Sequence, residues 1–335
     1  MDDSRYGTRN KRGDWKPARL LEYPPLFVWP VQPLAVLKWL FGFPGYLLPW
    51  NLLYAGIALL CWLCATPPLE TMRELAPGWI GFLLARNLIL ALLVFGGLHL
   101  RLYIQRGQGH AFKYNAKWLD TDNSAFLCRN QTVDNMIRSL GSGVLIWTAY
   151  EVLTWWASAN GWVAFVSWGT HPVYCTLLTL LIPLMRDLHF YLIHRLIHWP
   201  PLYTTVHRIH HANVNPGPWS GLAMHPIEHV LYFSGVLIHW IVPSHPVHAL
   251  FHLVHAGLTP AVGHAGFDKL MIGKSAVDTD SYEHYLHHKY FECNYGDGTI
   301  PIDRWMGTFH DGSEEAQRAM NRRFMARAAR SKAAQ

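Results

Sequence analysis

Three groups of histidines place the tightest constraint on the fold of this chain, because their spacing fits one side of a helix. The first group reads HRLIH, and two later groups, about seventy residues apart, both read HxxHH. Residues at positions i, i+3 and i+4 share a helical face, so each group can direct its imidazoles to one place. The histidines are His194, His198, His207, His210, His211, His284, His287 and His288.

The number of these histidines indicates a site for two metal ions. One ion needs roughly three or four protein ligands, so eight suit a pair. Histidine-bound irons suit the activation of dioxygen, because iron changes its oxidation state and zinc does not. The alternative is a chain that is simply rich in histidine, since 21 are present and some must be solvated or cap helices.

The composition indicates a membrane protein with a polar portion outside the lipid. Hydrophobic residues make up 51% and charged residues only 15%, against roughly 25% charged in soluble domains. The net charge is +6, but the basic residues gather at the two ends of the chain. Such flanking charges favour cytoplasmic anchoring next to membrane spans over nucleic-acid binding.

We therefore expect an all-α integral membrane protein with about four transmembrane helices and a cytoplasmic, histidine-rich helical cap that holds a dimetal site. About twenty apolar residues cross a bilayer, which predicts spans at 46–65, 79–103, about 140–156, and from 173 into the first histidine group. The segments 227–243 and 246–263 are short and contain histidine, so we predict a shallow hairpin that dips into the leaflet. A short apolar piece, 33–43, is expected at the interface.

The expected organisation has four parts. They are a cytoplasmic tail (1–32), a membrane-spanning region (33–170), a catalytic domain (171–312) and a basic C-terminal tail (313–335). The polar, basic start predicts no cleaved signal peptide, so the first span would direct insertion. A bacterial inner membrane and the endoplasmic reticulum fit this pattern equally well.

Six motifs in order carry a resemblance to a known family. They read HRLIH, HRIHH, AMHPIEH, GHAGF, HYLHH and NYGDGTIPIDRWMGTF, and they cover residues 187–309. This series resembles the fatty acid hydroxylase and sterol desaturase superfamily. The resemblance implies a membrane enzyme with a functional di-iron centre that uses dioxygen and two electrons to hydroxylate or desaturate a lipid. It also implies His264, in GHAGF, as a ninth metal ligand, with an interfacial hydrogen-bonding histidine as the alternative.

Two carboxylates are candidates for roles beside the metals. Asp187 lies seven residues before His194 and so on nearly the same helical face, where it could accept the free N–H of a metal-binding imidazole. The alternative for Asp187 is an ion pair with Arg186 or Arg195. Glu228 falls in the HP-x-E element of the family, which makes it the second candidate.

Five other histidines of this region have expected roles or alternatives of their own. His189 is about 140° around the helix from His194, so we expect it in packing or in support of a ligand. His225, beside a proline, is either a ligand or satisfies a backbone group. His248, His252 and His255 form one helical stripe that either lines a passage for substrate or protons or faces the cap.

The electron donor and the substrate are expected to be separate molecules. No cytochrome b5, nucleotide-binding or iron–sulfur motif is present, so a separate cytochrome b5, ferredoxin or reductase is implied. The superfamily acts on sterols, fatty acyl chains, sphingoid bases and other membrane lipids, and the sequence does not choose between them. The alternatives are a zinc-dependent membrane lipid hydrolase, which would need a general base that these motifs lack, and a metal transporter, which would need ligands inside the spans.

Overall fold

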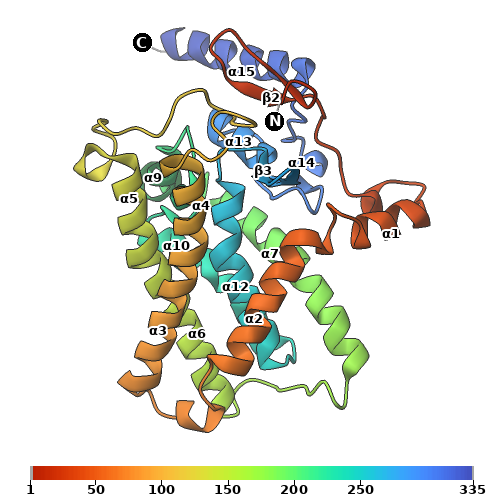
Figure 1. Ribbon diagram of the computed structural model, residues 1–335, viewed down its shortest axis with the longest axis vertical. Coiled ribbons are helices and arrows are strands. Elements are labelled where there is room, and N and C mark those ends of the chain that lie inside the picture. The colour runs from red at the N-terminus through yellow and green to blue at the C-terminus, as the bar shows by residue number, and fades with distance from the viewer. Residues whose placement is uncertain (1–2, 334–335) are drawn as a thin grey trace.

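The computed structural model describes residues 3–333 and is mostly helical, which confirms the expected fold class. Figure 1 shows long helices in a bundle, with a cap of short helices, strands and the longer helix α15 at the end where both chain termini lie. Helices suit lipid because they satisfy their own backbone hydrogen bonds. The bundle contains α2 (Leu52–Cys64), α3 (Pro77–Ala91), η4 (Leu92–Gly96), α4 (Gly97–His99), η5 (Leu100–Ile104), α5 (Gln131–Arg138), η7 (Ser139–Gly143), α6 (Val144–Ala159), α7 (Pro172–Ile197), α10 (Pro226–Phe233), η10 (Ser234–Leu237), α11 (Ile238–Ile241) and α12 (Pro246–Gly263).

Within residues 3–333, three helices are long and apolar enough to cross a membrane by length and composition. They cover Leu47–Cys64, Pro77–Ile104 and Pro172–Ile197, and coincide with three of the predicted spans. The segment predicted as a further span, 140–156, lies in η7 and α6. That segment is helical and packs against α3, but it is not among the three, so a fourth crossing stays a prediction.

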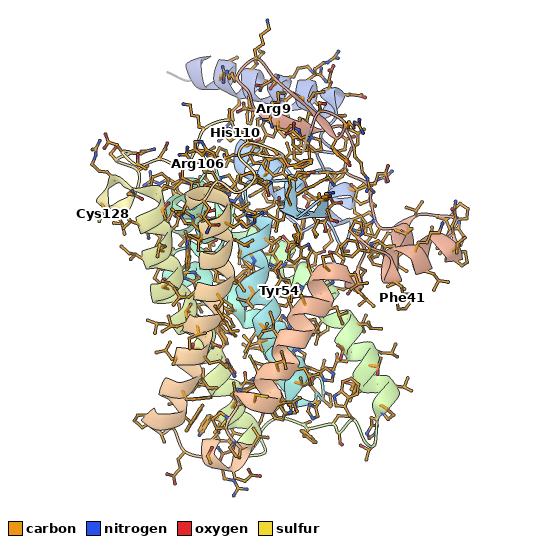
Figure 2. The ribbon with its side chains drawn as sticks, viewed as in Figure 1. Arg9, Phe41, Tyr54, Arg106, His110 and Cys128 are labelled. Atoms are coloured by element: carbon orange, nitrogen blue, oxygen red, sulfur yellow. The ribbon has the colours of Figure 1, made fainter. Side chains whose placement is uncertain are left out.

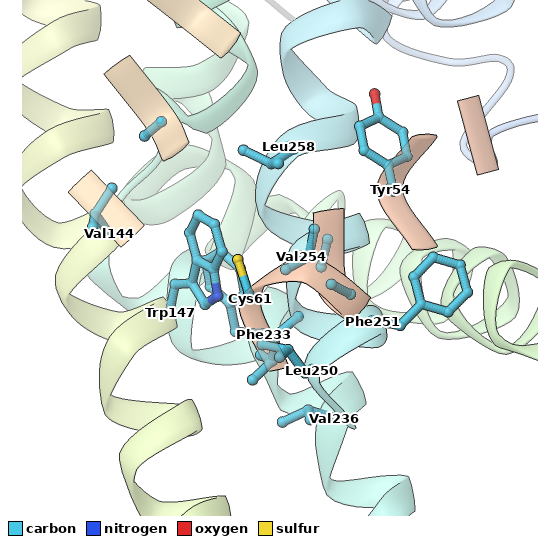
Figure 3. Close-up of a cluster of buried hydrophobic side chains, with 14 of the residues drawn as sticks. Tyr54, Cys61, Val144, Trp147, Phe233, Val236, Leu250, Phe251, Val254 and Leu258 are labelled. Atoms are coloured by element: carbon cyan, nitrogen blue, oxygen red, sulfur yellow. The ribbon is translucent and has the colours of Figure 1, made fainter. Parts of the chain in front are cut away.

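The helix α12 lies at the centre of the bundle and contacts α2, α3, α6 and α7. Almost all of its residues are buried. At Gly257 the Trp147 ring of α6 lies 2.7 Å from the place a Cβ would occupy, so any side chain there would push α6 away. Figure 3 shows part of the apolar cluster that surrounds α12, including Trp147, Leu250, Val254 and Leu258.

The prediction of a shallow hairpin at 227–263 is wrong. The turn between α11 and α12 contacts the loop between α6 and α7, where Phe165 forms a bridge with Ser244. It also contacts the first turn of α7, where the Tyr174 hydroxyl donates to the Pro243 carbonyl at 2.8 Å. The hairpin therefore runs the depth of the bundle (Figure 1). Its histidines mislead a hydropathy argument, because this helix is surrounded by protein and need not be apolar.

The cap combines segments from both ends of the chain. It contains β1 (Gly7–Arg9), β2 (Trp15–Pro17), α8 (Pro200–Leu202), η8 (Tyr203–His207), α9 (Arg208–His211), β3 (Lys269–Ile272), β4 (Ser275–Asp278), α13 (Tyr282–Tyr290), α14 (Ile302–Trp305) and α15 (Glu314–Ala333). The strands β1 and β2 pair antiparallel, as do β3 and β4. Trp15 is buried against Phe112 and Tyr114. Residues 3–32, expected as part of a tail, thus belong to the folded cap, and the C-terminal tail forms a helix up to Ala333.

A short helix, α1 (Pro33–Phe41), projects from the side of the molecule between the bundle and the cap (Figure 1). It exposes Leu34, Leu37 and Phe41, and Phe41 is labelled in Figure 2. An exposed apolar face on a helix beside a membrane bundle suits the membrane surface. Its place at the interface stays a prediction.

Candidate metal centre

Five elements bring the nine predicted ligands to the boundary between bundle and cap. The end of α7 carries His194 and, at its C-cap, His198. The π-helical turn η8 and the following α9 carry His207, His210 and His211, and α13 carries the third group. His264 caps α12. The helical placement of both HxxHH patterns is thus as expected from their spacing.

The nine histidines divide into two sets. The first contains five (His194, His198, His207, His211 and His287) and the second contains four (His210, His264, His284 and His288). Within each set the candidate ligand nitrogens all lie within 4.8 Å of one another. Each HxxHH pattern contributes histidines to both sets, so the two sets lie next to each other. This is the arrangement expected of two adjacent ions.

Hydrogen bonds at Nδ1 determine which nitrogen of several rings is free. His194 Nδ1 lies 2.7 Å from the Tyr295 carbonyl oxygen, His287 Nδ1 lies 2.6 Å from that of Cys293, and His264 Nδ1 lies 3.0 Å from that of Pro260. A carbonyl oxygen only accepts, so Nδ1 carries the proton in each ring. In the neutral imidazole, Nε2 is then left with a lone pair for a metal.

The contacts among Nε2 atoms fit a cation better than they fit hydrogen bonds. His198 Nε2 lies 3.1 Å from the Nε2 atoms of His207, His211 and His287. His264 Nε2 has three similar neighbours, at 2.9 Å from His284, 3.1 Å from His288 and 3.3 Å from His210. One neutral imidazole nitrogen can donate or accept a single hydrogen bond. Nitrogens bound at about 2.1 Å to one ion, about 90° apart, would themselves be about 3 Å apart.

The electrostatic environment keeps these histidines neutral. Burial, and then the neighbouring imidazoles, lower the pKa of His207, His210, His211, His284, His287 and His288 well below its usual range. The same causes lower the pKa of His198 to about 2, and burial lowers that of His264 to about 3. Only neutral imidazole binds a metal, so the site is prepared for one near neutral pH.

A cavity of about 750 Å³ connects the histidines with the region around α1. Its inner wall includes His210, His264 and His284 of the four-histidine set and His194 and His207 of the other. At the other end it is lined by Lys38 and Trp39 of α1 and by the residues Tyr23 to Pro25. The cavity therefore gives a ligand of lipid size access to both sets.

Of the two candidate carboxylates, Glu228 and not Asp187 holds the position expected of Asp187 beside an imidazole. Asp187 does not accept from an imidazole, and instead its oxygens accept from the backbone N–H groups of Asp297 at 3.0 Å and Ile300 at 2.7 Å. Glu228 is the carboxylate beside a histidine, since His207 Nδ1 donates to its Oε1 at 2.8 Å. The expectation for Asp187 is corrected because a loop about 110 residues away takes both of its oxygens.

The other histidines lie outside the two sets. His225 caps α10, and its Nδ1 accepts from the Ile227 N–H at 3.2 Å, which is the backbone role. His189 contacts the Ser234 hydroxyl, and His248 contacts the Cys175 carbonyl. In the stripe on α12, His252 contacts His239, whereas His255 lines the cavity.

The segment after the third histidine group folds back over the site, as its sequence motifs predict, but its carbonyl contacts to the histidines were not predicted. Residues 294–308 fold over α7 and α13: the Asn294 N–H donates to the Thr308 carbonyl, and the Gly296 N–H donates to Asp303 at 2.7 Å. Tyr295 and Cys293 supply the carbonyls that orient His194 and His287. The NYG and D-x-x-x-GT-F motifs indicate a closing segment, but no side-chain pattern marks a carbonyl acceptor.

Comparison with known proteins gives a family match over the same region. Residues 179–308 match the fatty acid hydroxylase family. The chain is 31% identical over 160 residues to Delta(7)-sterol 5(6)-desaturase ERG3B of Gibberella zeae, covering 44% of this chain and 48% of the relative. It is 30% identical over 132 residues to the Delta(7)-sterol 5(6)-desaturase of Eremothecium gossypii, covering 39% of this chain and 37% of the relative. It is 31% identical over 124 residues to Delta(7)-sterol 5(6)-desaturase ERG3 of Saccharomyces cerevisiae, covering 37% of this chain and 33% of the relative. These matches span less than half the length of each relative. No solved structure matches the chain.

Proposed function

We propose that this chain, whose residues 179–308 match the fatty acid hydroxylase family, is a membrane-bound di-iron oxygenase that hydroxylates or desaturates a lipid. The observation that carries the proposal is the pair of histidine sets at the inner end of a lipid-sized cavity. The nine histidines named above are the proposed ligands. Two bound irons would supply the redox chemistry that dioxygen activation requires.

The protein's own contribution is to orient ligands and substrate and to exclude water. Carbonyls of Tyr295, Cys293 and Pro260 fix three rings, and Glu228 fixes His207. An ion held by the set of four histidines would have fewer protein ligands than one held by the set of five, and three members of the set of four line the cavity. We therefore propose that the substrate's reacting carbon lies beside this set. Phe190 supplies an apolar surface next to His194.

Access from the membrane is proposed to be lateral. The cavity wall includes Trp39 and Lys38 of α1, whose exposed apolar residues suit the lipid surface. A membrane lipid could then pass from the leaflet to the histidines without crossing water. Asp187 serves this route as a structural residue that holds the 297–300 loop, which also lines the cavity.

Two further parts of the proposal concern the surroundings of the enzyme. We propose that the histidine end faces the cytoplasm, because the basic residues of both termini lie at that end. We also propose that electrons come from a separate carrier such as cytochrome b5, a ferredoxin or a reductase. The basic helix α15 offers a surface for an acidic carrier.

Lipid profiling of expressing cells tests the proposed activity. Cells that express the wild-type chain should accumulate, only under oxygen, a lipid with one added hydroxyl or one added double bond. His287→Ala should abolish this product because it removes a proposed ligand. His171→Ala is the matched control, since His171 is exposed and outside both sets, and it should leave the product unchanged. A hydrolysed lipid formed equally without oxygen would reject the oxygenase and favour a hydrolase.

A further inference from the structure

Two buried polar groups in the cavity lack a partner. Arg186 of α7 is 6% exposed and Tyr54 of α2 is 1% exposed, and both line the cavity. Among residues 3–333, Arg186 Nε has no hydrogen-bond partner, and the Tyr54 hydroxyl makes no hydrogen bond of good geometry, although the side chain of Thr259, which also lines the cavity, lies near it. Buried polar groups are rarely left unpaired, because desolvation is costly without a hydrogen bond. Unpaired groups that face a cavity therefore point to a ligand.

The rest of the Arg186 guanidinium is fixed. Its Nη1 forms an ion pair with Asp297, and its Nη2 donates to the Tyr232 hydroxyl at 2.9 Å. The guanidinium carbon also lies 5.1 Å from the centre of the Phe190 ring. These contacts hold the side chain in place while Nε–H stays free, which is the arrangement of a preorganised donor.

Tyr54 is held in a similar way. Its ring lies 5.3 Å from that of His255 and 6.4 Å from that of Trp50. Figure 3 shows its hydroxyl pointing away from the labelled apolar side chains. His255 Nε2 already contacts Asn51 Oδ1 at 2.8 Å, so this ring nitrogen is not the hydrogen-bond partner of the Tyr54 hydroxyl. The hydroxyl is close enough to Arg186 for the two groups to interact electrostatically.

Arg186 lies on the same face of α7 as the candidate metal ligand His194. Arg186, Phe190 and His194 occupy positions i, i+4 and i+8 of α7, so they follow one another along one face of the helix. Two helical turns separate Arg186 from His194, about 12 Å along the axis. A lipid whose polar end binds at Arg186 would pass its apolar body over Phe190 toward the histidines.

The charges in the cavity favour a neutral ligand group. Asp297 already balances the Arg186 charge. Among the lining residues seven carry a carboxyl group, whereas the cationic ones are Arg186 and, nearer α1, Arg19 and Lys38. A carboxylate headgroup at Arg186 would add a further negative charge beside Asp297 and Asp187. A hydroxyl oxygen accepts from Nε–H without that repulsion.

We propose that Arg186 and Tyr54 bind the neutral hydroxyl group of a lipid alcohol and so position its carbon skeleton at the metal centre. Arg186 Nε–H donates to the hydroxyl oxygen, and the Tyr54 hydroxyl completes the pair as donor or acceptor. This inference rests on the proposed function and narrows its substrate class. Both sterols and linear lipid alcohols carry the group.

Binding of labelled lipids to the purified, iron-loaded protein in detergent tests this assignment. The probes are 5α-cholestan-3β-ol against 5α-cholestane, and 1-octadecanol against octadecane and octadecanoate. We expect at least one alcohol to bind about tenfold more tightly than its own hydrocarbon, which is the effect of one good hydrogen bond. The alcohol that does so identifies the sterol or the linear source.

Two conservative variants assign that preference to the named groups. Tyr54→Phe removes only the hydroxyl, and Arg186→Lys keeps a cation for Asp297 but lacks Nε–H. Each should weaken alcohol binding about tenfold and leave hydrocarbon binding unchanged. Tyr150→Phe is the matched control, because the Tyr150 hydroxyl donates to the Val230 carbonyl and does not line the cavity.

The outcomes separate this inference from the proposed function. An alcohol preference that survives in both variants, octadecanoate binding more tightly than 1-octadecanol, or no binding of either alcohol would overturn the assignment. The variants should retain the iron content of the wild type, since neither residue belongs to a histidine set. A wild-type protein that holds no iron would reject the di-iron proposal, while the alcohol preference could still be measured.

Discussion

At the scale of residues, the second nitrogen of each imidazole matters as much as the nitrogen directed at the metal. His207 shows this most clearly, because its Nδ1–H donates to Glu228, which is buried and has one oxygen, Oε2, without a partner among residues 3–333. A carboxylate in this position fixes the ring and increases its basicity as a ligand. We therefore propose that Glu228 supports metal binding through His207, without being a ligand itself.

Removing Glu228 should weaken iron binding. We expect Glu228→Ala to lower iron affinity about 10- to 100-fold, the usual effect of losing the hydrogen-bond partner of a ligand histidine. Glu228→Gln should have a smaller effect, because its amide oxygen can still accept from Nδ1–H. Anaerobic titration of iron against a competing chelator measures both, with the exposed Glu70→Ala as control. Wild-type affinity in Glu228→Ala would refute this role.

Acid should destabilise the metal-free protein. In the unfolded chain, histidine binds a proton below about pH 6.5, whereas burial keeps the pKa of His198 at about 2 and that of His264 at about 3. The unfolded state thus binds more protons, so stability is lost as the pH falls below about 6.5, by about 1.4 kcal/mol per pH unit for each such histidine. Thermal unfolding of metal-stripped protein in detergent measures this, and a constant melting temperature from pH 7.5 to 5.5 would contradict it.

The two carboxylates also show what local periodicity can and cannot predict. The seven-residue spacing correctly places Asp187 on the buried side of α7, but its partners come from residues 297 and 300. Periodicity carries no information about a contact between segments about 110 residues apart. Arg186 and Tyr54 were missed for the same reason, since they meet only when α2 and α7 line one cavity.

At the scale of elements, the contact between α3 and α6 depends on a buried ion pair. Arg86 of α3 pairs with Glu151 of α6, and Asn87 and Trp155 also donate to the Glu151 carboxylate. Both charged residues are buried. A charge in an apolar bundle is tolerated when it is paired and fully hydrogen bonded.

Removing one partner of this ion pair should lower the free energy of unfolding more than replacing both partners. We expect Glu151→Ala to lower the free energy of unfolding by about 3–5 kcal/mol, because Arg86 would stay buried without its partner. The double variant Arg86→Met, Glu151→Leu should recover most of that loss. Thermal unfolding in detergent compares them, and a Glu151→Ala protein as stable as the wild type would show that the pair does not hold these helices.

The helix α12 shows where a hydropathy argument fails at this scale. Hydropathy identified α2, α3 and α7, which all expose apolar residues along their length. It misjudged α12, because a helix enclosed by others can carry His248, His252 and His255 without exposing them to lipid. The depth of a buried hairpin depends on its neighbours, and these appear only in the assembled bundle.

At the scale of the whole molecule, the bundle and the cap form one structure around the histidines. The helices of the expected membrane region, 33–170, and of the expected catalytic region, 171–312, share one apolar core. Both termini lie at the histidine end. Under the proposed topology, the polar cap and the proposed metal ligands therefore lie on one side of the lipid.

That sidedness can be measured with a native cysteine. Cys128 is exposed at the histidine end of the molecule (Figure 2). In a Cys64→Ser background, a membrane-impermeant maleimide should label Cys128 in inside-out vesicles and not in intact cells. Labelling should disappear in Cys128→Ser. Labelling of intact cells would place the histidine end outside the cytoplasm.

The central claim is that one chain binds two irons through the two histidine sets, and metal analysis of detergent-purified protein tests it most directly. Protein expressed with iron supplied should contain about two irons per chain, since each set suits one ion. His210→Ala and His287→Ala, which remove one ligand from each set, should each lower the iron content. Stoichiometric zinc that persists after anaerobic reconstitution with iron, or a single iron per chain, would contradict the account.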